Sequence, residues 1–186
     1  MFIGRVLVLF VGIGFLSFDF NPEIAASDYI EAYKDLAIVE MYRTGIPASI
    51  TLAQGLHESN YGKSKLATEA NNHFGIKCKN YWTGKTYYYK DDDQNKKGQI
   101  TESCFRAYES DIDSYIDRSN FLAQTERYEM LFDFGKTDYK AWAYGLKVCG
   151  YATDENYAYK LLSKIEKYNL DKYDTYEDPF KLLIKK

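Results

Sequence analysis

The chain has 186 residues, a formal net charge of −3 at pH 7 and a pI near 5.5. That length supports one domain with a sizeable core and is short for two. The acidic balance provides no basic surface for a run of phosphates, so nucleic acid is excluded as a partner. Membrane contact is expected only through an N-terminal segment that is retained.

The N-terminal segment has the composition of an export signal. One basic residue, Arg5, precedes an apolar run from Val6 to Leu16. This run is shorter than the roughly 20 residues that cross a bilayer as a helix, which is typical of a signal peptide. Ala25-Ala26-Ser27 offers a cleavage region, and an uncleaved anchor is the alternative. We therefore expect residues 1–26 to direct export to the periplasm or the outside.

The next two predicted elements are helices. Ser27 is a suitable N-cap for a helix that ends at Gly45, and Pro47 begins a second helix that runs to Glu58. The sequence Asn60-Tyr61-Gly62 breaks that helix. Glu58 therefore lies at a helix C-terminus, where the negative end of the macrodipole disfavours the carboxylate relative to the neutral acid.

In the middle of the chain the residue pattern changes from helical periodicity to one typical of strands. A short helix over 64–70 is followed by two segments rich in strand formers, 85–90 and 99–106. The charged, glycine-containing stretch 91–98 separates them. This pattern predicts a β-hairpin with a long tip.

The remainder of the chain returns to helical periodicity. The predicted helices and their N-caps are 111–123 after Ser110, 138–149 after Thr137, and 154–168 after Thr153. From Lys172 onwards we expect an extended surface tail. The predicted fold class is α+β, mostly α, with a domain over 27–173 and a C-terminal tail over 174–186.

Three cysteines and two histidines limit the redox and metal chemistry. An exported chain permits one disulfide, and Cys78 with Cys104 is the better pair because these residues flank the hairpin region. Cys149 is expected to be a buried, inert thiol. With only His57 and His73, and no Cys-x-x-Cys spacing, no metal site is expected.

One segment carries a strong family resemblance. The run IPASITLAQGLHESNYGKS, residues 46–64, closely resembles the catalytic segment of the mannosyl-glycoprotein endo-β-N-acetylglucosaminidase-like domain, glycoside hydrolase family 73. Later blocks resemble the family in the right order, namely NNHFGIKC at 71–78, CFRAY at 104–108, WAYGLK at 142–147 and GYATD at 150–154. The similarity extends from about Tyr29 to Tyr173.

The resemblance implies a lysozyme-like helical domain with a small β-hairpin lobe. It also implies cleavage of the β-1,4 bond between N-acetylglucosamine and N-acetylmuramic acid in peptidoglycan glycan strands. Glu58 matches the family's acid, which protonates the departing sugar oxygen. No metal or organic cofactor is implied, and we expect a monomer.

Further site residues follow from the matching blocks. Tyr151 matches a tyrosine that borders the cleft, where its hydroxyl would hydrogen-bond the substrate or the acid. Asn72 and Phe74 match the loop that shapes the floor beside the acid, although a Phe in this position is more often a core residue than a ligand contact. We also expect Tyr61 and Trp142, which lie in two of the blocks, to contact the glycan.

The residue that would act as the second carboxylate is less clearly identified by the resemblance. In the family a glutamate of the hairpin lobe is the usual base, and Glu102 lies where that residue is expected. However, Ser103 separates Glu102 from the CFRAY block, and a shift of one residue turns a strand side chain to the opposite face unless a bulge intervenes. The nearby alternatives are three consecutive aspartates, Asp91, Asp92 and Asp93.

Two other functions remain open. A lytic transglycosylase also uses one helix-end glutamate in a lysozyme-like fold but needs no second carboxylate. A non-catalytic cell-wall-binding protein of the same fold is the other alternative. The sequence also leaves open whether Glu102 activates water, giving inversion, or the substrate's own N-acetyl group assists.

Overall fold

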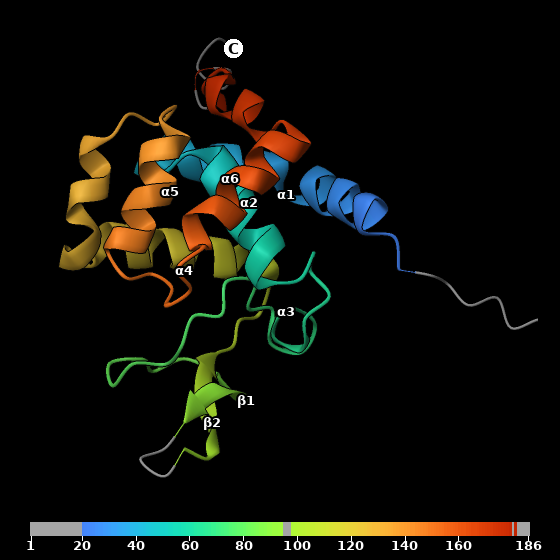
Figure 1. The fold of residues 1–186 in the computed structure, drawn as a ribbon, viewed down its shortest axis with the longest axis vertical. Helices are drawn as coiled ribbons and strands as arrows, with labels where there is room; N and C mark the ends of the chain where they lie inside the picture. The colour runs from blue at the N-terminus through green and yellow to red at the C-terminus, as the bar shows by residue number, and fades with distance from the viewer. Residues whose placement is uncertain (1–19, 95–97, 180, 182–186) are drawn as a thin grey trace, which may run out of the picture.

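The computed structural model describes residues 20–94, 98–179 and 181 (Figure 1). The apolar run expected to act as a signal lies outside these residues. Within them the chain is mostly helical with one two-stranded antiparallel sheet, which confirms the predicted fold class. None of the helices in the described ranges has the length and apolar character needed to cross a membrane.

The helices form one lobe and the strands form a second, smaller lobe below it (Figure 1). The elements in chain order are α1 (Pro22–Thr44), α2 (Ala48–Glu58), α3 (Lys65–Ala70), β1 (Thr86–Gln94), β2 (Ile100–Arg106), α4 (Asp111–Gln124), η1 (Glu126–Asp133), α5 (Tyr139–Val148), α6 (Tyr157–Tyr168) and η2 (Leu170–Thr175).

Helix α1 begins earlier than predicted. Its N-cap is Asn21, whose side chain accepts from the backbone of Glu23 and Ile24, and Pro22 occupies the first helical position. An asparagine cap followed by proline is a stronger start signal than Ser27, so the predicted cap was wrong. Ala25 and Ala26 are buried within the first turns. The cleavage region expected there therefore lies inside a packed helix.

Helix α2 has the predicted bounds and lies at the centre of the helical lobe. Every residue from Ala48 to Leu56 is buried, and the helix packs against α1, α5, α6 and η2. Its N-cap, Pro47, has no side chain that can accept a hydrogen bond. Asp174 of η2 fills that role, because its carboxylate accepts from the backbone N and the Oγ of Ser49 at 2.8 and 2.6 Å.

The C-terminal elements differ in detail from the prediction. Asp138 rather than Thr137 caps α5, because its carboxylate accepts from the backbone N of Ala141. Helix α6 begins at Tyr157, and Thr153 is not its cap. In the preceding turn, the Asp154 carboxylate accepts a hydrogen bond from the backbone N of Asn156. The extended tail predicted from Lys172 is wrong for its first residues, which form the 3-10 helix η2.

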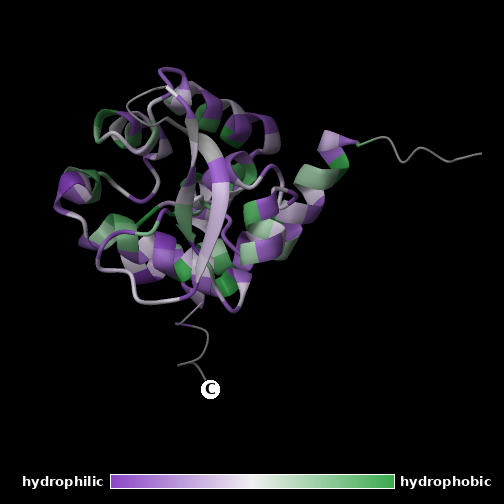
Figure 2. Cartoon of the chain, turned by 90° about the horizontal axis from the view of Figure 1, so that it is seen from below, coloured by the Kyte–Doolittle hydropathy of each residue, from purple (hydrophilic) through white to green (hydrophobic). Residues whose placement is uncertain are grey.

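The hairpin lobe is held by a regular ladder and a disulfide. The register runs from Thr86 opposite Arg106 to Lys90 opposite Glu102, and the irregularity falls beyond Lys90. Cys78 and Cys104 form the predicted disulfide with a Cα–Cα distance of 5.3 Å, and Cys149 is a buried free thiol, as predicted. The strands are mostly hydrophilic or neutral (Figure 2), so this lobe adds little to the core.

Arg106, the last residue of β2, anchors the hairpin lobe to α4. Its guanidinium donates to both carboxylate oxygens of Asp117 at 2.9 and 2.8 Å and lies over the Trp82 ring at 4.5 Å. Tyr108 donates to the same Asp117 carboxylate at 2.6 Å. These contacts fix the position of the hairpin relative to the helical lobe.

Candidate active site

Glu58 is the last residue of α2, as predicted, and its side chain is largely withdrawn from water. Burial raises the pKa of this carboxyl from 4.5 to about 7 because the charged form loses hydration. The Tyr157 hydroxyl and the cations Arg118, Lys164 and Lys160 oppose that shift. A carboxyl with this pKa can hold a proton at neutral pH and release it to a substrate.

The Tyr157 hydroxyl is the hydrogen-bond partner of the acid. It lies 2.8 Å from Oε1 of Glu58. Sequence reasoning missed this residue and gave the role to Tyr151. The helical spacing Tyr157, Leu161, Ile165 was the available signal, because it places all three on the buried face of α6, which packs against α2.

A buried polar chain continues behind Tyr157. Gln54 and Glu58 are four residues apart and so project from the same face of α2. Nε2 of Gln54 lies 2.8 Å from the Tyr157 hydroxyl, and Arg118 of α4 donates to Oε1 of Gln54. Arg118 also donates to Oγ1 of Thr51 at 3.0 Å. The acid is therefore connected to a buried cation through two side chains.

Tyr151 lies beside this chain without joining it. Its ring stacks on Tyr157, with centroids 5.6 Å apart and planes at 25°. Its hydroxyl is buried and has no hydrogen-bond partner of acceptable geometry among the described residues. Burial and the neighbouring Glu58 carboxylate both raise its pKa, while the Arg118 cation lowers it. Tyr151 therefore stays protonated near the acid, but it is not the tyrosine that contacts it.

Basic side chains surround the acid on the α6 side. Burial, together with repulsion from Lys164 and Lys160, lowers the pKa of His57 to about 4. The imidazole is therefore neutral at physiological pH. Burial and the neighbouring lysines also lower the pKa of Lys164, whereas the Glu58 carboxylate raises it. The attraction between Lys164 and Glu58 is therefore present only when Glu58 is ionised, and it stabilises the carboxylate.

The loop after α3 has a structural role. Asn72 is buried and donates to the carbonyls of Ile76 and Arg106 at 3.0 and 2.8 Å, while its Oδ1 accepts from the backbone N of Phe74 and Ile76. These bonds use both donors and both acceptor positions of the amide, so Asn72 retains none for the substrate contact predicted for it. Phe74 is also buried and packs edge-on against Tyr115 at 4.8 Å, in the core.

The two other predicted glycan contacts have different positions. Trp142 is 0% exposed and packs edge-on against Phe132, so the contact predicted for it is wrong: the ring is inside the core. The WAYGLK block gave no signal of which face of α5 this residue occupies. Tyr61 is partly exposed just beyond the end of α2, with a φ of 59°, and its pKa is raised by burial and by Tyr168. It remains available to a ligand.

Glu102 is exposed on β2, opposite Lys90. The ladder is regular at this point, so no bulge turns the residue, and Glu102 shares a strand face with Cys104. Ser103, on the opposite face, is 8% exposed. No direct contact joins Glu102 to Glu58 in the described ranges. The backbone of Asp91, Asp92 and Asp93 belongs to β1.

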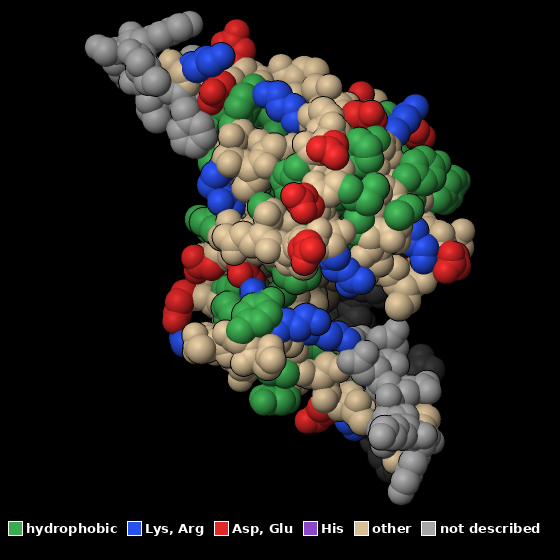
Figure 3. All heavy atoms as spheres, turned by 90° about the vertical axis from the view of Figure 1, so that its left-hand side faces the viewer, with side chains coloured by type: hydrophobic (Ala, Val, Ile, Leu, Met, Phe, Trp, Pro, Cys, Tyr) green, Lys and Arg blue, Asp and Glu red, His purple; other side chains and the backbone are tan. Residues whose placement is uncertain are grey.

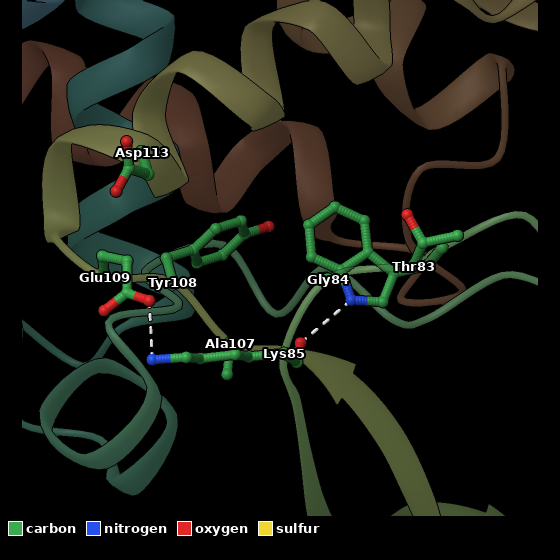
Figure 4. Close-up of a pocket in the computed structure, with 8 residues that line it drawn as sticks. Thr83, Gly84, Lys85, Ala107, Tyr108, Glu109 and Asp113 are labelled. Atoms are coloured by element: carbon green, nitrogen blue, oxygen red, sulfur yellow. Dashed lines mark hydrogen bonds and ion pairs between the residues drawn. The ribbon is translucent and has the colours of Figure 1, made fainter.

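Two pockets flank the segment that joins α3 to the hairpin, and Glu58 lines neither. Figure 3 shows a hollow where the upper, helical part of the surface meets the hairpin part. A pocket of about 550 Å³ lies between Trp82 and the start of α4, and the second, about 440 Å³, lies between Tyr81 and the end of α4. In the first, an ion pair of Lys85 with Glu109 closes one side (Figure 4).

No group of three or more His, Cys, Asp or Glu side chains suited to a metal ion occurs in the described part of the chain. A glutamate with a raised pKa at the end of a buried helix, in a helical domain that carries a small hairpin lobe, is the arrangement of lysozyme-like glycoside hydrolases. The fold and the position of Glu58 therefore indicate the class of lysozyme-like glycoside hydrolases. Comparison with known proteins identifies the family.

The glucosaminidase family model, described as mannosyl-glycoprotein endo-beta-N-acetylglucosaminidase, matches residues 34–170. The exo-glucosaminidase LytG of Bacillus subtilis is 36% identical over 131 residues, which cover 68% of this chain and 45% of that protein. The catalytic domain of the autolysin Auto from Listeria monocytogenes has a TM-score of 0.70 at 27% identity, over 80% of this chain and 87% of that one.

A mutant peptidoglycan hydrolase from Sphingomonas sp. A1 has a TM-score of 0.66 at 32% identity, over 78% of this chain and 96% of that one. The chain therefore belongs to the glucosaminidase family of glycoside hydrolases, glycoside hydrolase family 73, as its sequence motifs predicted. It spans less than half the length of the full-length relatives that it matches.

Proposed function

We propose that this protein hydrolyses peptidoglycan at the β-1,4 bond between N-acetylglucosamine and N-acetylmuramic acid, with Glu58 as the general acid. The observation that carries the proposal is the Glu58 carboxyl, which burial holds at a pKa of about 7. An ordinary glutamate is protonated in about one molecule in 300 at pH 7, whereas this one is protonated in about half. Membership of the glucosaminidase family supplies the substrate class.

In this mechanism Glu58 gives its proton to the glycosidic oxygen as the bond to the anomeric carbon breaks. Positive charge grows on the sugar, and the new Glu58 carboxylate lies near that charge. The hydrogen bond from Tyr157 stabilises the carboxylate once it forms. Arg118 and Lys164 act in the same direction through their charge.

Glu102 is our proposed second carboxylate. Its support is its position on an exposed strand of the hairpin lobe, where water and substrate can reach it. An acid–base partner of this kind contributes on the order of 10² to 10⁴ in rate. We expect Glu102→Gln to lower kcat within that range, while Lys90→Gln on the paired strand serves as the matched control. Equal activity of the two variants would instead favour assistance by the substrate's N-acetyl group.

The site of action that fits this function is the cell wall, outside the cytoplasm. Hydrolases of peptidoglycan are the relatives of this chain, and the disulfide between Cys78 and Cys104 suits an oxidising compartment. We propose that the protein is exported by its N-terminal segment and acts as a monomer on glycan strands. Fractionation of cells that produce the full chain would locate it.

The decisive experiment is digestion of purified cell wall, with mass spectrometry of the products. The native chain is expected to release fragments with a reducing-end N-acetylglucosamine. Glu58→Gln keeps the shape of the side chain and removes the proton, so we expect kcat to fall by at least about 10³. A 1,6-anhydro product would instead identify a lytic transglycosylase, and equal digestion by the glutamine variant would remove Glu58 from the mechanism.

A further inference from the structure

The polar chain behind Glu58 begins at a group that can only donate. Arg118 is fully buried, and its guanidinium has five N–H donors and no acceptor. Its hydrogen-bond acceptors are Thr51 and Gln54. No carboxylate lies within ion-pair distance of it among the described residues. Its two terminal nitrogens therefore donate to neutral oxygens, one of which belongs to the path towards Glu58, while its buried Nε has no hydrogen-bond partner among the described residues.

Gln54 has only one orientation that fits this neighbour. If its amide were reversed, an NH₂ group would face the guanidinium and two donors would oppose each other inside the core. Oε1 must therefore face Arg118, and Nε2 must face the Tyr157 hydroxyl, 2.8 Å away. The amide thus donates to Tyr157 and cannot accept from it.

The direction of the hydrogen bond from Gln54 to Tyr157 determines the direction of the hydrogen bond from Tyr157 to Glu58. A phenol has one proton, and the two hydrogen-bond partners of this hydroxyl are Gln54 and Glu58. Since it accepts from Gln54, its own proton points to Oε1 of Glu58. That oxygen is occupied as an acceptor whether Glu58 is neutral or ionised.

We infer that Arg118 and Gln54 are positioning residues that fix the direction of the Tyr157 proton, so that the proton released by Glu58 is carried on Oε2. This inference rests on the proposed function, which makes Glu58 the acid. A neutral carboxyl with a free choice of oxygen would spend part of its time with the proton on Oε1, directed at Tyr157 and away from the glycosidic bond. The chain removes that unproductive form.

The sharpest test is Gln54→Glu, which changes one NH₂ to an oxygen and keeps the shape. The substituted carboxylate can still accept from Arg118, but it can no longer donate to Tyr157. The Tyr157 proton is then drawn towards the new carboxylate, and Oε1 of Glu58 becomes free to carry the acid's proton. We expect kcat to fall on the order of tenfold with KM within about twofold, because proton placement changes and glycan contacts do not.

The pH profile separates this effect from loss of structure. Gln54→Glu draws the Tyr157 proton away from the Glu58 carboxylate and adds a negative charge nearby, so the basic limb of kcat/KM is expected to move up by about one pH unit. Thr51→Val removes the other acceptor of Arg118 but lies off the path to Tyr157. It is expected to leave that limb in place. A basic limb at the native position in Gln54→Glu would overturn the inference.

A double-mutant cycle tests whether Gln54 acts through Tyr157. Tyr157→Phe removes the shared hydroxyl, so in that background Gln54→Glu should change kcat by less than about twofold. An undiminished tenfold effect without the hydroxyl would overturn the inference.

A carbon-13 titration of the Glu58 side-chain carboxyl gives a readout that needs no turnover. The signal is assigned by its loss in Glu58→Gln, and both Gln54→Glu and Tyr157→Phe are expected to raise its midpoint. If the native chain digests no cell wall while these midpoints move, the proposed function fails and the hydrogen-bond direction stands. Unmoved midpoints in folded variants would contradict the direction itself.

Discussion

At the scale of single residues, the acid strength of Glu58 reflects two opposed effects. Withdrawal from water raises its pKa, and the hydrogen bond from Tyr157 together with the Arg118 cation limits the rise. A value of about 7 lies between full protonation and full ionisation at neutral pH. The carboxyl can therefore both give up a proton and regain it near neutral pH, as the proposed role of general acid requires.

The raised pKa of Glu58 predicts a pH-dependent cost in stability. The folded chain holds this proton more tightly than the unfolded chain does, so ionisation destabilises the fold as the pH rises from about 4.5 through 7. Glu58→Gln removes this cost. Thermal unfolding at pH 8 should show the variant more stable on the order of 2 kcal/mol, with the gain shrinking towards pH 5.

The contribution of His57 to stability has the opposite pH dependence. Its folded pKa is lowered to about 4, so its contribution to stability is present above the unfolded pKa of 6.5 and is lost as the pH falls. Comparing Glu58→Gln with native protein at each pH cancels this term, because both carry His57. A gain that is equal at pH 5 and pH 8 would contradict the assignment of the shift to Glu58.

Sequence reasoning proposed Glu58 as the acid and missed the tyrosine that is hydrogen-bonded to it. Glu58 was singled out by the resemblance of residues 46–64 to the family's catalytic segment, and its place at a helix end was predictable because Asn60-Tyr61-Gly62 breaks the helix locally. Tyr157 lies 99 residues away, and its contact depends on how α6 packs on α2. Trp142 was misplaced for the same reason, since a motif states which residue is present and not which side of the helix faces the core.

At the scale of elements, α2 depends on another segment at its first turn. Pro47 offers no capping side chain, and the Asp174 carboxylate of η2 replaces it by binding Ser49. Burial raises the pKa of Asp174 to about 6, although its bonds to Ser49 lower it. The helix that ends in the acid is therefore stabilised at its start by the C-terminal segment.

Removal of this cap should destabilise the fold. Asp174→Ala leaves the first-turn donors of α2 without an acceptor, and we expect a loss of about 1 to 2 kcal/mol in denaturant unfolding. Asp174→Asn can still accept from the Ser49 backbone and is the matched control, with a smaller loss. Equal stability of the alanine and native proteins would show that water replaces the carboxylate at no cost.

Gly55 of α2 lies against the side chain of Tyr29 from α1. A Cβ at this position would lie 2.4 Å from the hydroxyl of Tyr29, a buried side chain bonded to Tyr115 and His73. We expect Gly55→Ala to lower stability by about 1 to 3 kcal/mol through overpacking, despite the better helix propensity of alanine. Gly135→Ala, where the new methyl meets nothing within 4 Å, is the control. A higher melting temperature for Gly55→Ala would refute the close packing.

Element types were predictable, and their first residues were less so. The prediction started α1 at Ser27, six positions after the observed cap, because it assigned the residues before Ser27 to the export segment. The residues after Lys172 read as a tail because their polar composition hides two buried side chains, Tyr173 and Asp174. The second error concerns a segment whose order comes from tertiary packing, whereas the start of α1 is encoded locally by Asn21 and Pro22.

At the scale of the whole molecule, two lobes of unequal stability are joined side by side. The helical lobe contains most of the buried apolar residues, whereas Phe105 is the buried apolar side chain of the described hairpin strands. The hairpin lobe is held instead by the Cys78–Cys104 disulfide and the Arg106–Asp117 ion pair. The hairpin lobe should therefore open before the helical lobe unfolds.

The disulfide offers a way to test this order. Cys78 and Cys104 are 26 residues apart, and cross-links of that loop length stabilise by about 3 kcal/mol in chain-entropy models. Reduction should speed hydrogen exchange across β1 and β2 while the helical signal in circular dichroism persists. Cys149→Ala removes the free thiol and keeps the cross-link, so it should exchange as the native protein does. Simultaneous loss of both lobes would show a single cooperative unit.

The fold class and the disulfide were predictable because helical and strand periodicity, and the cysteines flanking the hairpin, are local features of the sequence. The docking of the hairpin onto α4 was not predictable, because nothing in the sequence indicates that Arg106 and Asp117 form an ion pair. The same limit applies to the second carboxylate. The regular register around Glu102 became apparent only once the strands were paired.

The bond between Ser49 and Asp174 spans 125 residues of sequence. A chain that emerges from the ribosome or a translocation channel, N-terminus first, exposes α2 long before η2 exists. The contact that caps this helix is long-range, and long-range contacts form later in folding than local ones. The first turn of α2 therefore receives its carboxylate partner only after η2 has been synthesised, although the helix itself lies early in the sequence.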